Sequence, residues 1–322
     1  MSEVVSHSML PLKVLPSRPR RKHPSWIKTR FSENERYHFL KRVLREKGLH
    51  TVCEEAQCPN IGECWAHGTA TFMLMGDTCT RGCTFCAVDK GKPLMLDVSE
   101  PAHVAEVIEA LGLDYAVLTS VNRDDLPDEG AGHVALTIEA ISRRIPTCRV
   151  EALVPDFHAR RDCIERVACT PLFVYAHNVE TVPRLYRRVR PGSDYQQSLR
   201  ALATAKECRD DLMTKSSLML GLGETRDEVL EVCRDLRAVG CDVVTFGQYL
   251  QPSANQQEVF RYVTPDEFEE LRRLAGDLGF RQVVSGPMVR SSYHAWEIVD
   301  TEADSTTGVP DSPPSAQRPA SS

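Results

Sequence analysis

Short apolar, β-branched runs alternate with amphipathic helical stretches through most of this chain of 322 residues. A strand followed by a helix, repeated six times, predicts a parallel sheet. Six units fall short of the eight that close a full barrel. We therefore expect an α/β fold built as a partial (β/α)6 TIM-like barrel, with a doubly wound sheet as the competing topology. The predicted strands span residues 71–75, 115–119, 149–154, 172–176, 217–220, 243–246 and 282–284.

Three of the predicted helices begin with capping signals, in which a Ser or Thr precedes a Glu by three residues. The first is expected to run to Lys47, because Gly48 is a typical helix terminator. Behind the other two signals, apolar residues recur at helical spacing and predict faces that pack in the core. The pairs are Ser32 with Glu35, Thr225 with Glu228, and Thr264 with Glu267.

Charge and composition divide the chain further. Its net charge is −6, which disfavours nucleic acid as the main partner, but residues 1–30 carry +6 and the remainder −12. We expect a basic, partly flexible arm at 1–31, an N-terminal extension at 32–70, the barrel at 71–298 and a disordered Ser/Thr/Pro/Ala tail at 299–322. Prolines in the arm disfavour the amphipathic helix of a mitochondrial transit peptide, and no apolar run is long enough for a membrane span. A cytoplasmic, bacterial-type location is expected.

Six of the twelve cysteines are clustered in the first third of the chain, and the other six are scattered among apolar neighbours. A long intracellular chain keeps its thiols reduced, so the clustered cysteines are interpreted as metal ligands. The scattered ones are expected to be small core residues. These are Cys148, Cys163, Cys169, Cys208, Cys233 and Cys241.

Cys79-x3-Cys83-x2-Cys86 supplies three thiolates, with no fourth cysteine or histidine nearby. A structural zinc site is normally closed by four protein ligands, so this is a poor zinc site. Three thiolates on a tight loop suit a [4Fe-4S] cluster and leave one iron open to a small molecule. The spacing, with Phe85 before the last cysteine and a strand before the loop, resembles the radical S-adenosylmethionine superfamily. That resemblance implies that the open iron chelates S-adenosylmethionine, whose reductive cleavage yields a 5′-deoxyadenosyl radical.

Cys53-x4-Cys58-x5-Cys64 forms a second triplet, between the first helix and the first strand. An alternative interpretation, three buried thiols on a loop, is weak because polar residues are interleaved with the cysteines. Three thiolates again leave one iron without a protein ligand. The interleaved residues are Glu54, Glu55, Gln57, Asn60 and Glu63.

Seven stretches of the chain resemble lipoyl synthases more closely than the superfamily at large. The resemblance runs from about Trp26 to Trp296 and leaves out the basic arm and the tail. The stretches span residues 52–60, 67–73, 119–126, 151–157, 221–225, 247–252 and 290–295.

This resemblance implies that sulfur is inserted at carbons six and eight of an octanoyl group held in amide linkage on a lysine of a carrier protein. Unactivated C–H bonds resist acids and bases at neutral pH, so each insertion would use one hydrogen abstraction and one S-adenosylmethionine. The Cys53/Cys58/Cys64 cluster would donate the sulfur. In the family a serine of the Arg-Ser-Ser-Tyr motif is its fourth ligand, which corresponds to Ser292, with Ser291 the near alternative.

The implied partners are octanoylated carrier domains of 2-oxoacid dehydrogenases (the E2 subunits) and the H protein of glycine cleavage. An electron donor such as ferredoxin or flavodoxin and iron–sulfur assembly or carrier proteins are implied as well. Arg187, Arg188 and Arg190 are expected to form an ordinary solvated helix face, with steering of an acidic carrier as the alternative.

Polar residues that follow the predicted strands are further candidates for contact with the cofactor or the acyl-lysine, because ligands of parallel sheets bind beyond the carboxyl ends of the strands. For each of them a purely structural loop role stays open. The cofactor-binding candidates are Phe85, Asn122, Asp124, Glu151, Asn178 and Gln248.

Two other functions compete with this interpretation. Sulfur insertion into a free small molecule, as in biotin synthase, shares the Cys79 triplet but leaves the Cys53 triplet and the serine motif unexplained. A non-catalytic iron–sulfur module for electron transfer needs neither a large barrel nor an open iron.

Overall fold

The structure is a computed structural model that describes residues 23–28, 35–55, 58, 60–66 and 71–292. The predicted tail at 299–322, most of the basic arm and the capping residue Ser32 lie outside these residues. Residues 23–28 lie against the barrel, because the Trp26 indole N–H donates to the carbonyl of Val263 at 3.2 Å. Among the described helices, none is long and apolar enough to cross a membrane.

The sheet has eight strands in the order β1-β2-β5-β6-β7-β8-β9-β10. Every pair from β2 to β10 is parallel, and only β1 runs antiparallel, against β2. The order follows the chain without reversal, which rules out the doubly wound alternative and confirms a partial barrel. The strands are β1 (His50–Thr51), β2 (Thr71–Leu74), β5 (Tyr115–Ser120), β6 (Arg149–Leu153), β7 (Val174–Ala176), β8 (Met213–Leu220), β9 (Val243–Gln248) and β10 (Gln282–Gly286).

Two strands begin at other residues than predicted, one strand was not predicted, and the others differ by one or two residues at their ends. β8 begins at Met213 rather than at residue 217, because its first half carries polar residues that hide the apolar pattern. β7 begins two residues later than predicted, at Val174. β1 was not predicted, since two residues are too short to give a periodic signal.

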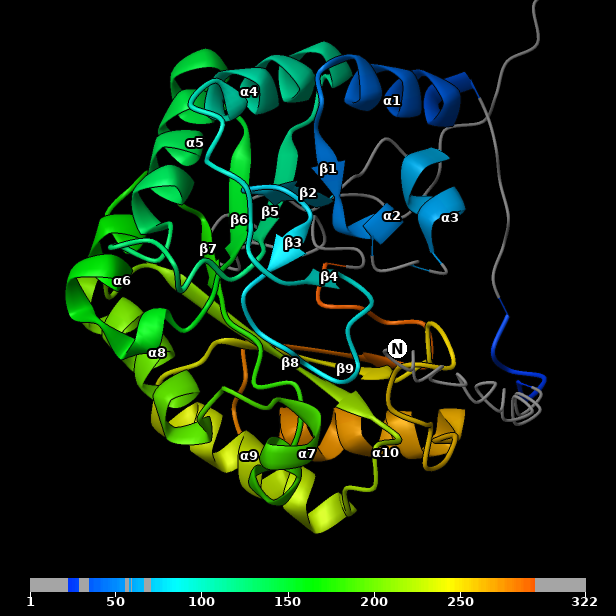
Figure 1. Cartoon of the computed structure of the whole chain (residues 1–322). Helices are drawn as coiled ribbons and strands as arrows, with labels where there is room; N and C mark the ends of the chain where they lie inside the picture. Colours follow the sequence, from blue (N-terminus) through cyan, green and yellow to red (C-terminus); the bar gives the residue numbers. More distant parts are fainter. Residues whose placement is uncertain (1–22, 29–34, 56–57, 59, 67–70, 293–322) are drawn as a thin grey trace, which may run out of the picture.

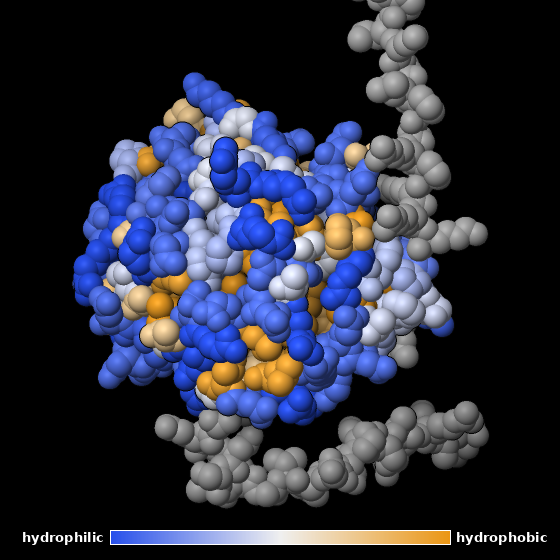
Figure 2. Space-filling view, turned by 90° about the horizontal axis from the view of Figure 1, so that it is seen from below, coloured by the Kyte–Doolittle hydropathy of each residue, from blue (hydrophilic) through white to orange (hydrophobic). Residues whose placement is uncertain are grey.

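Six helices cover the outer face of the curved sheet and leave its inner face to the barrel interior (Figure 1). Seen from below Figure 1, the surface is mostly hydrophilic, with hydrophobic residues gathered in separate patches (Figure 2). The six are α4 (Glu100–Leu111), α5 (Ala131–Arg144), α6 (Arg161–Ala168), α8 (Tyr195–Cys208), α9 (Arg226–Ala238) and α10 (Pro265–Gly276).

The remaining elements are short except for α1, which has 12 residues. The predicted capping boxes of α9 and α10 are both formed, and Gly48 takes the predicted left-handed conformation after α1, with φ +63°. These elements are α1 (Glu35–Glu46), α2 (Val52–Glu55), α3 (Ile61–Ala66), α7 (Tyr186–Val189), the 3-10 turns Phe157–Ala159 and Pro183–Leu185, and the paired strands β3 (Thr78–Cys79) and β4 (Asp89–Lys90).

The scattered cysteines mostly lie in the core, as predicted. Four are buried and Cys208 is half-buried. Burial raises the pKa of Cys233 and of Cys241 to about 12, so both thiols are protonated and unreactive. The prediction is wrong for Cys169, which is exposed because it follows the last residue of α6 and caps that helix.

A buried ion pair joins two strands across the barrel. Lys215 Nζ lies 2.9 and 3.0 Å from the two carboxylate oxygens of Glu151, and the Tyr115 hydroxyl donates to the same carboxylate at 2.8 Å. Burial, with the charge of Glu151, raises the pKa of Tyr115 well above its ordinary value, so Tyr115 stays a donor. Lys215 and Tyr115 thus both bond to the Glu151 carboxylate, and these bonds link β5, β6 and β8.

Replacing Lys215 by Met should lower the free energy of unfolding by about 3–5 kcal/mol, because Glu151 is left as an unpaired buried charge. The double variant Glu151→Gln/Lys215→Met should recover most of that loss. Urea unfolding followed by circular dichroism measures both. Equal stability of the single and the double variant would contradict this account of the pair.

Candidate metal centre

The loop that carries Cys79, Cys83 and Cys86 crosses the open end of the barrel, drawn in cyan in Figure 1. The Thr80 N–H donates to the carbonyl of Asn122, which follows β5, at 3.1 Å. On the other side, the Thr84 N–H donates to Val189 O of α7 at 3.0 Å, and the Gln257 N–H donates to Thr84 O at 2.8 Å. The loop is therefore held at the carboxyl ends of the strands, where parallel barrels place their active sites.

Three N–H groups point at the sulfur of Cys79. The backbone N–H groups of Arg81 and Asn122 each lie 3.4 Å from Sγ, and the Asn122 side-chain amide Nδ2 lies 3.6 Å from it. Bonds of this kind stabilise negative charge on sulfur and raise the reduction potential of a cluster held by that sulfur. Asn122, a predicted cofactor contact, thus lies beside a predicted cluster ligand.

The Arg81 side chain fastens the cysteine loop to two strand ends. Its guanidinium donates to Asp124 at 2.8 Å and to Asp156 at 2.9 Å, and the Arg81 and Asp156 side chains are both buried. Burial acts to raise the pKa of Asp156, but the bonds from Arg81 outweigh it and hold that pKa well below its ordinary value. Both carboxylates are therefore charged, and the predicted cofactor contact Asp124 is first of all a partner of Arg81.

A second buried arginine lies beside Cys83. Arg190 donates to the carbonyl of Asn178 at 2.9 Å and to the Tyr186 hydroxyl at 3.0 Å. Its positive charge opposes the rise in the Cys83 pKa that burial causes. The solvated face expected for three arginines therefore holds for Arg187 and Arg188, which are exposed, and is wrong for Arg190.

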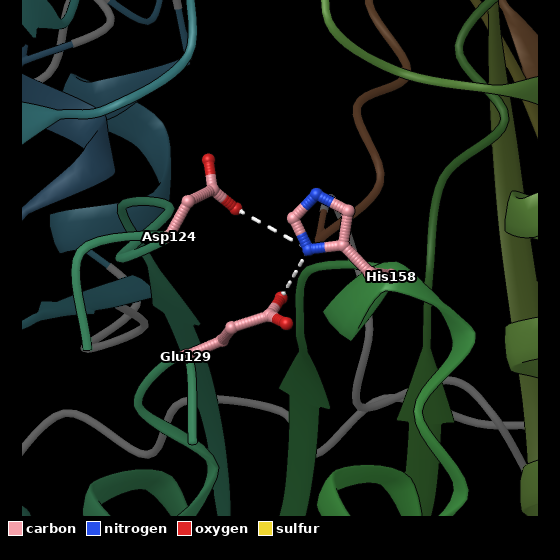
Figure 3. A group of neighbouring side chains, drawn as sticks. All are labelled: Asp124, Glu129 and His158. Atoms are coloured by element: carbon pink, nitrogen blue, oxygen red, sulfur yellow. Dashed lines mark ion pairs between the residues drawn. The ribbon is translucent and has the colours of Figure 1, made fainter. Parts of the chain in front are cut away.

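Asp124 also belongs to a cluster with Glu129 and His158 (Figure 3). His158 Nδ1 lies 2.9 Å from Glu129 Oε2 and 3.8 Å from Asp124 Oδ1. Asp124 already accepts from Arg81, and Arg160 lies 3.9 Å from Glu129. The two arginines balance the carboxylates, so this cluster is a network of ion pairs around the end of β5.

Several buried polar atoms at the mouth have no hydrogen-bond partner among the described residues. They include Oδ1 of Asn122 and of Asn178, both predicted cofactor contacts, and Nε2 of His177. Burial, and then the charge of Arg190, lower the pKa of His177 to about 4. The neutral ring donates from Nδ1 to Val154 O at 2.8 Å, which leaves Nε2 as an acceptor. Unpaired buried acceptors are costly, so these atoms indicate a polar ligand at the mouth.

The second triplet lies on α2, α3 and the segment between them. The Cys58 N–H donates to Cys53 O at 3.0 Å, which keeps these two cysteines close along the backbone, and the Cys64 N–H donates to Asn60 O at 2.9 Å. Burial raises the pKa of Cys53 to about 11. A thiol buried in this way becomes a thiolate only when a cation, such as a metal, accompanies it.

The C-terminal end of the barrel closes over this second triplet. Asn60 Nδ2 donates to Met288 O at 2.7 Å, and Thr71 Oγ1 donates to Ser292 Oγ at 2.9 Å. Thr71 also hydrogen-bonds to Cys53, and Arg290 contributes its charge beside Cys58. No carboxylate in the described part of the chain pairs with Arg290. The thiols of Cys53 and Cys58, the Ser292 hydroxyl and the Arg290 side chain are therefore near one another, and Cys64 follows on α3.

The donor sets fit clusters better than single ions. Tetrahedral zinc with 2.3 Å bonds to sulfur would bring its ligand sulfurs to roughly 3.8 Å of one another. Among the described residues, only Asp124, Glu129 and His158 form a group of three such ligands within 4.8 Å, so the sulfurs of neither triplet are that close. A larger iron–sulfur cube would fill the wider spacing.

Three predicted cofactor contacts have bonding or packing partners within the protein. Glu151 is buried, with its carboxylate engaged by Lys215 and Tyr115. The Gln248 amide donates to Leu220 O and accepts from the Val263 N–H, so it fastens the loop after β9. Phe85 is half-buried and packs against the core cluster.

Four functional candidates were missed by sequence reasoning. Arg81 lies inside the Cys-x3-Cys motif, and Asp156 lies in a stretch already singled out, so their positions were available as a signal. Glu180, whose pKa burial raises, and Thr71 gave no signal, because their roles depend on contacts between distant segments.

The open barrel with a Cys-x3-Cys-x2-Cys loop across its mouth defines a radical S-adenosylmethionine enzyme. The model of the Radical SAM superfamily matches residues 73–236. The fold resembles methylornithine synthase (TM-score 0.50, 12% identity, 78% of each chain covered) and a maturase of the [FeFe]-hydrogenase (TM-score 0.53, 14% identity, 78% of this chain and 56% of that one).

The chain belongs to the lipoyl synthase family. The model of the N-terminal domain of lipoyl synthase matches residues 10–58, so the family likeness reaches into the basic arm, further than expected. Lipoyl synthase of Methylococcus capsulatus is 54% identical over 89% of each chain, and that of Laribacter hongkongensis is 52% identical over 89% of this chain and 91% of its own. Lipoyl synthase of Chloroflexus aurantiacus is 54% identical over 87% of this chain and 90% of its own. Membership implies S-adenosylmethionine and [4Fe-4S] clusters as cofactors.

Replacing Arg81 by Lys should speed the loss of iron from the Cys79 site to a chelator by about tenfold, since lysine offers a point charge and cannot bridge Asp124 and Asp156. In the control Arg123→Lys the replaced arginine pairs with Asp125 and with neither Asp124 nor Asp156, so the rate should stay unchanged. Anaerobic absorbance measurements follow the release. Equal rates in both variants would show that Arg81 does not secure the loop.

Replacing Asn122 by Asp removes one N–H donor to Cys79 Sγ and adds negative charge, so the reduction potential of the cluster should fall by tens of millivolts. Asn255→Asp, on an exposed loop, is the matched control. Redox titration followed by electron paramagnetic resonance gives both values. An unchanged potential in Asn122→Asp would contradict the role of the amide.

Proposed function

We propose that this lipoyl synthase inserts two sulfur atoms, at carbons six and eight of a protein-bound octanoyl-lysine, and that its two triplets hold two different [4Fe-4S] clusters. When bound, the cluster of Cys79, Cys83 and Cys86 supplies the electron that cleaves S-adenosylmethionine, and the cluster of Cys53, Cys58 and Cys64 supplies the sulfur. Each C–S bond replaces one C–H bond.

The observation that carries this proposal is the closure of the C-terminal segment over the second triplet. The hydrogen bond between Thr71 and Ser292 brings the hydroxyl of Ser292 close to Cys53, across 221 positions of sequence. We assign Ser292 as the fourth ligand of the second cluster. Its alkoxide would be a harder and less natural partner of iron than thiolate, so Ser292 would be the most easily released of the four ligands.

The chain's own residues have distinct tasks in this proposal. Arg290 balances the negative charge of the second cluster, and Thr71 orients Ser292. At the mouth, Asn122 and Asn178 present their side-chain oxygens to the amino group of S-adenosylmethionine. Asp124 contributes indirectly, because its bond to Arg81 holds the cysteine loop in place. Phe85, Glu151 and Gln248 support the walls of this site from the cysteine loop, from β6 and from β9.

Lipoyl synthases act on lipoyl-carrier proteins. We propose the E2 subunits of 2-oxoacid dehydrogenases and the H protein of glycine cleavage as carriers, ferredoxin or flavodoxin as electron donor, and iron–sulfur carrier proteins as the source of a rebuilt cluster. The bacterial relatives support a cytoplasmic location. Sulfur insertion into a free small molecule is less well supported, because it leaves the Cys53 triplet and its serine without a task.

Incubation of reduced enzyme with S-adenosylmethionine and an octanoylated carrier peptide should yield a peptide with two added sulfurs, seen by mass spectrometry. Before the reaction the enzyme should hold about eight iron and eight sulfide ions per chain, as two cubes require. A chain with a single cube, or no thiolated peptide, would refute the proposal.

Ser292→Cys should keep the iron of the second cluster but lose most sulfur insertion, because a thiolate is not released as an alkoxide is. Ser291→Cys is the matched control, one residue away and without the bond to Thr71, and it should stay active. Iron content and product yield are measured together. The labile-ligand role of serine would be untenable if both variants were fully active.

A further inference from the structure

Four large hydrophobic side chains are exposed on two segments beside the cysteine loop. Leu94, Met95 and Val98, between β4 and α4, are 86%, 96% and 92% exposed, and Phe260, after β9, is 65% exposed. We call these four residues the rim patch. Three of them stand within five positions of the chain, and exposed hydrophobic residues gathered in this way usually mark an interaction site.

Hydrogen bonds place both segments at the border of the mouth. The Gly91 N–H donates to Cys79 O at 3.0 Å, which ties the start of the 91–98 segment to the first cluster ligand. The other segment is tied by the bond from the Gln257 N–H to Thr84 O and by one from the Phe260 N–H to Gly221 O at 2.8 Å. Both segments that carry the rim patch are therefore bonded to the cysteine loop at the border of the mouth.

Positive side chains flank the rim patch. Lys90 and Lys92 are exposed just before Leu94, where the exposed Asp89 and Asp97 balance their charge, and Arg187 and Arg188 are exposed on α7, whose carbonyls bond to Thr84. A side chain built at Gly223 would meet Arg188 Nη2 at 3.5 Å and the ring of Phe260 at 3.6 Å, so these two groups lie close together. The surface suits a partner that is apolar at its centre and acidic on the side that meets Arg187 and Arg188.

The substrate itself requires a docking surface at this place. An octanoyl group on a lysine is short compared with a folded domain, so the domain must touch the rim before the acyl chain can enter the barrel. The other large exposed hydrophobic residues in the described part of the chain are Phe39 on α1 and Leu136 on α5, which lie outside this border, and Trp26, which is bonded to Val263 and is only 37% exposed. The rim patch is therefore the surface that a carrier domain would meet.

We propose that the rim patch, with its flanking cations, is the docking surface for the folded carrier domain, which contacts it through an apolar and acidic face. This inference rests on the proposed function, because it takes the acyl-lysine to be protein-bound. It also separates two tasks: the cysteine loop and its neighbours recognise the acyl-lysine, and the rim patch recognises the domain.

The test compares two substrates, an octanoylated carrier domain and a short octanoyl-lysine peptide cut from it. In Leu94→Ser/Met95→Ser/Val98→Ser the KM for the domain should rise at least about tenfold, equivalent to about 1.4 kcal/mol. The KM for the peptide and the kcat with either substrate should stay unchanged. Leu136→Ser, on α5 and 46% exposed in the wild type, is the matched control and should behave as wild type.

Calorimetric binding of the octanoylated domain to each variant gives a readout that does not depend on turnover. Binding weakened about tenfold only in the triple variant supports the docking surface. Unchanged binding overturns it, as do equal losses with domain and peptide. A change from dimer to monomer with unchanged KM also overturns it, and assigns the rim patch to a second copy of this chain.

Wild-type enzyme that binds the domain but thiolates neither substrate would refute the proposed function instead.

Discussion

The bond of Arg81 to Asp124 and Asp156 is the interaction on which the mouth of the barrel depends. A guanidinium taken out of water is tolerated only where carboxylates meet it with good geometry, and here two strand ends each supply one. The cysteine loop therefore has one position relative to β5 and β6. The N–H groups around Cys79, the unpaired oxygens of the asparagines and the rim patch all take their places from that position.

The second metal centre depends on a different kind of contact, between the two ends of the barrel. Two described backbone bonds of the segment with Cys53, Cys58 and Cys64 are local, whereas Asn60 and Thr71 bond to residues 288–292. This centre therefore depends on contact between the two ends of the barrel. The first centre depends instead on segments that follow β5, β6 and β9 and on α7.

Much of the fold was predictable because hydrophobic residues recur every two positions in a strand and about every 3.6 positions in a helix, and short stretches of sequence show these repeats. The cysteine spacing likewise predicts both metal centres, since a thiolate-bound cluster needs its ligands close together. Polar residues are harder to interpret from the sequence. Lys215 and Ser216 hid half of β8, and Glu151 and Gln248, predicted to meet the cofactor, also have bonding partners within the protein. Arg81, Arg190 and Thr71 act through partners 43 or more residues away or through burial, which no local pattern records.

Strand β2 begins at Thr71, beside the second centre, and its far end leads into the loop of the first. Four residues of extended chain span roughly 13 Å, and hydrogen bonds to β5 prevent that length from changing. In the function proposed above, the strand would thus fix the distance between the cluster that generates the radical and the cluster that supplies the sulfur. An acyl chain attacked at two of its carbons in turn would then have to slide or bend between these fixed points, because the enzyme could not shorten the distance for it.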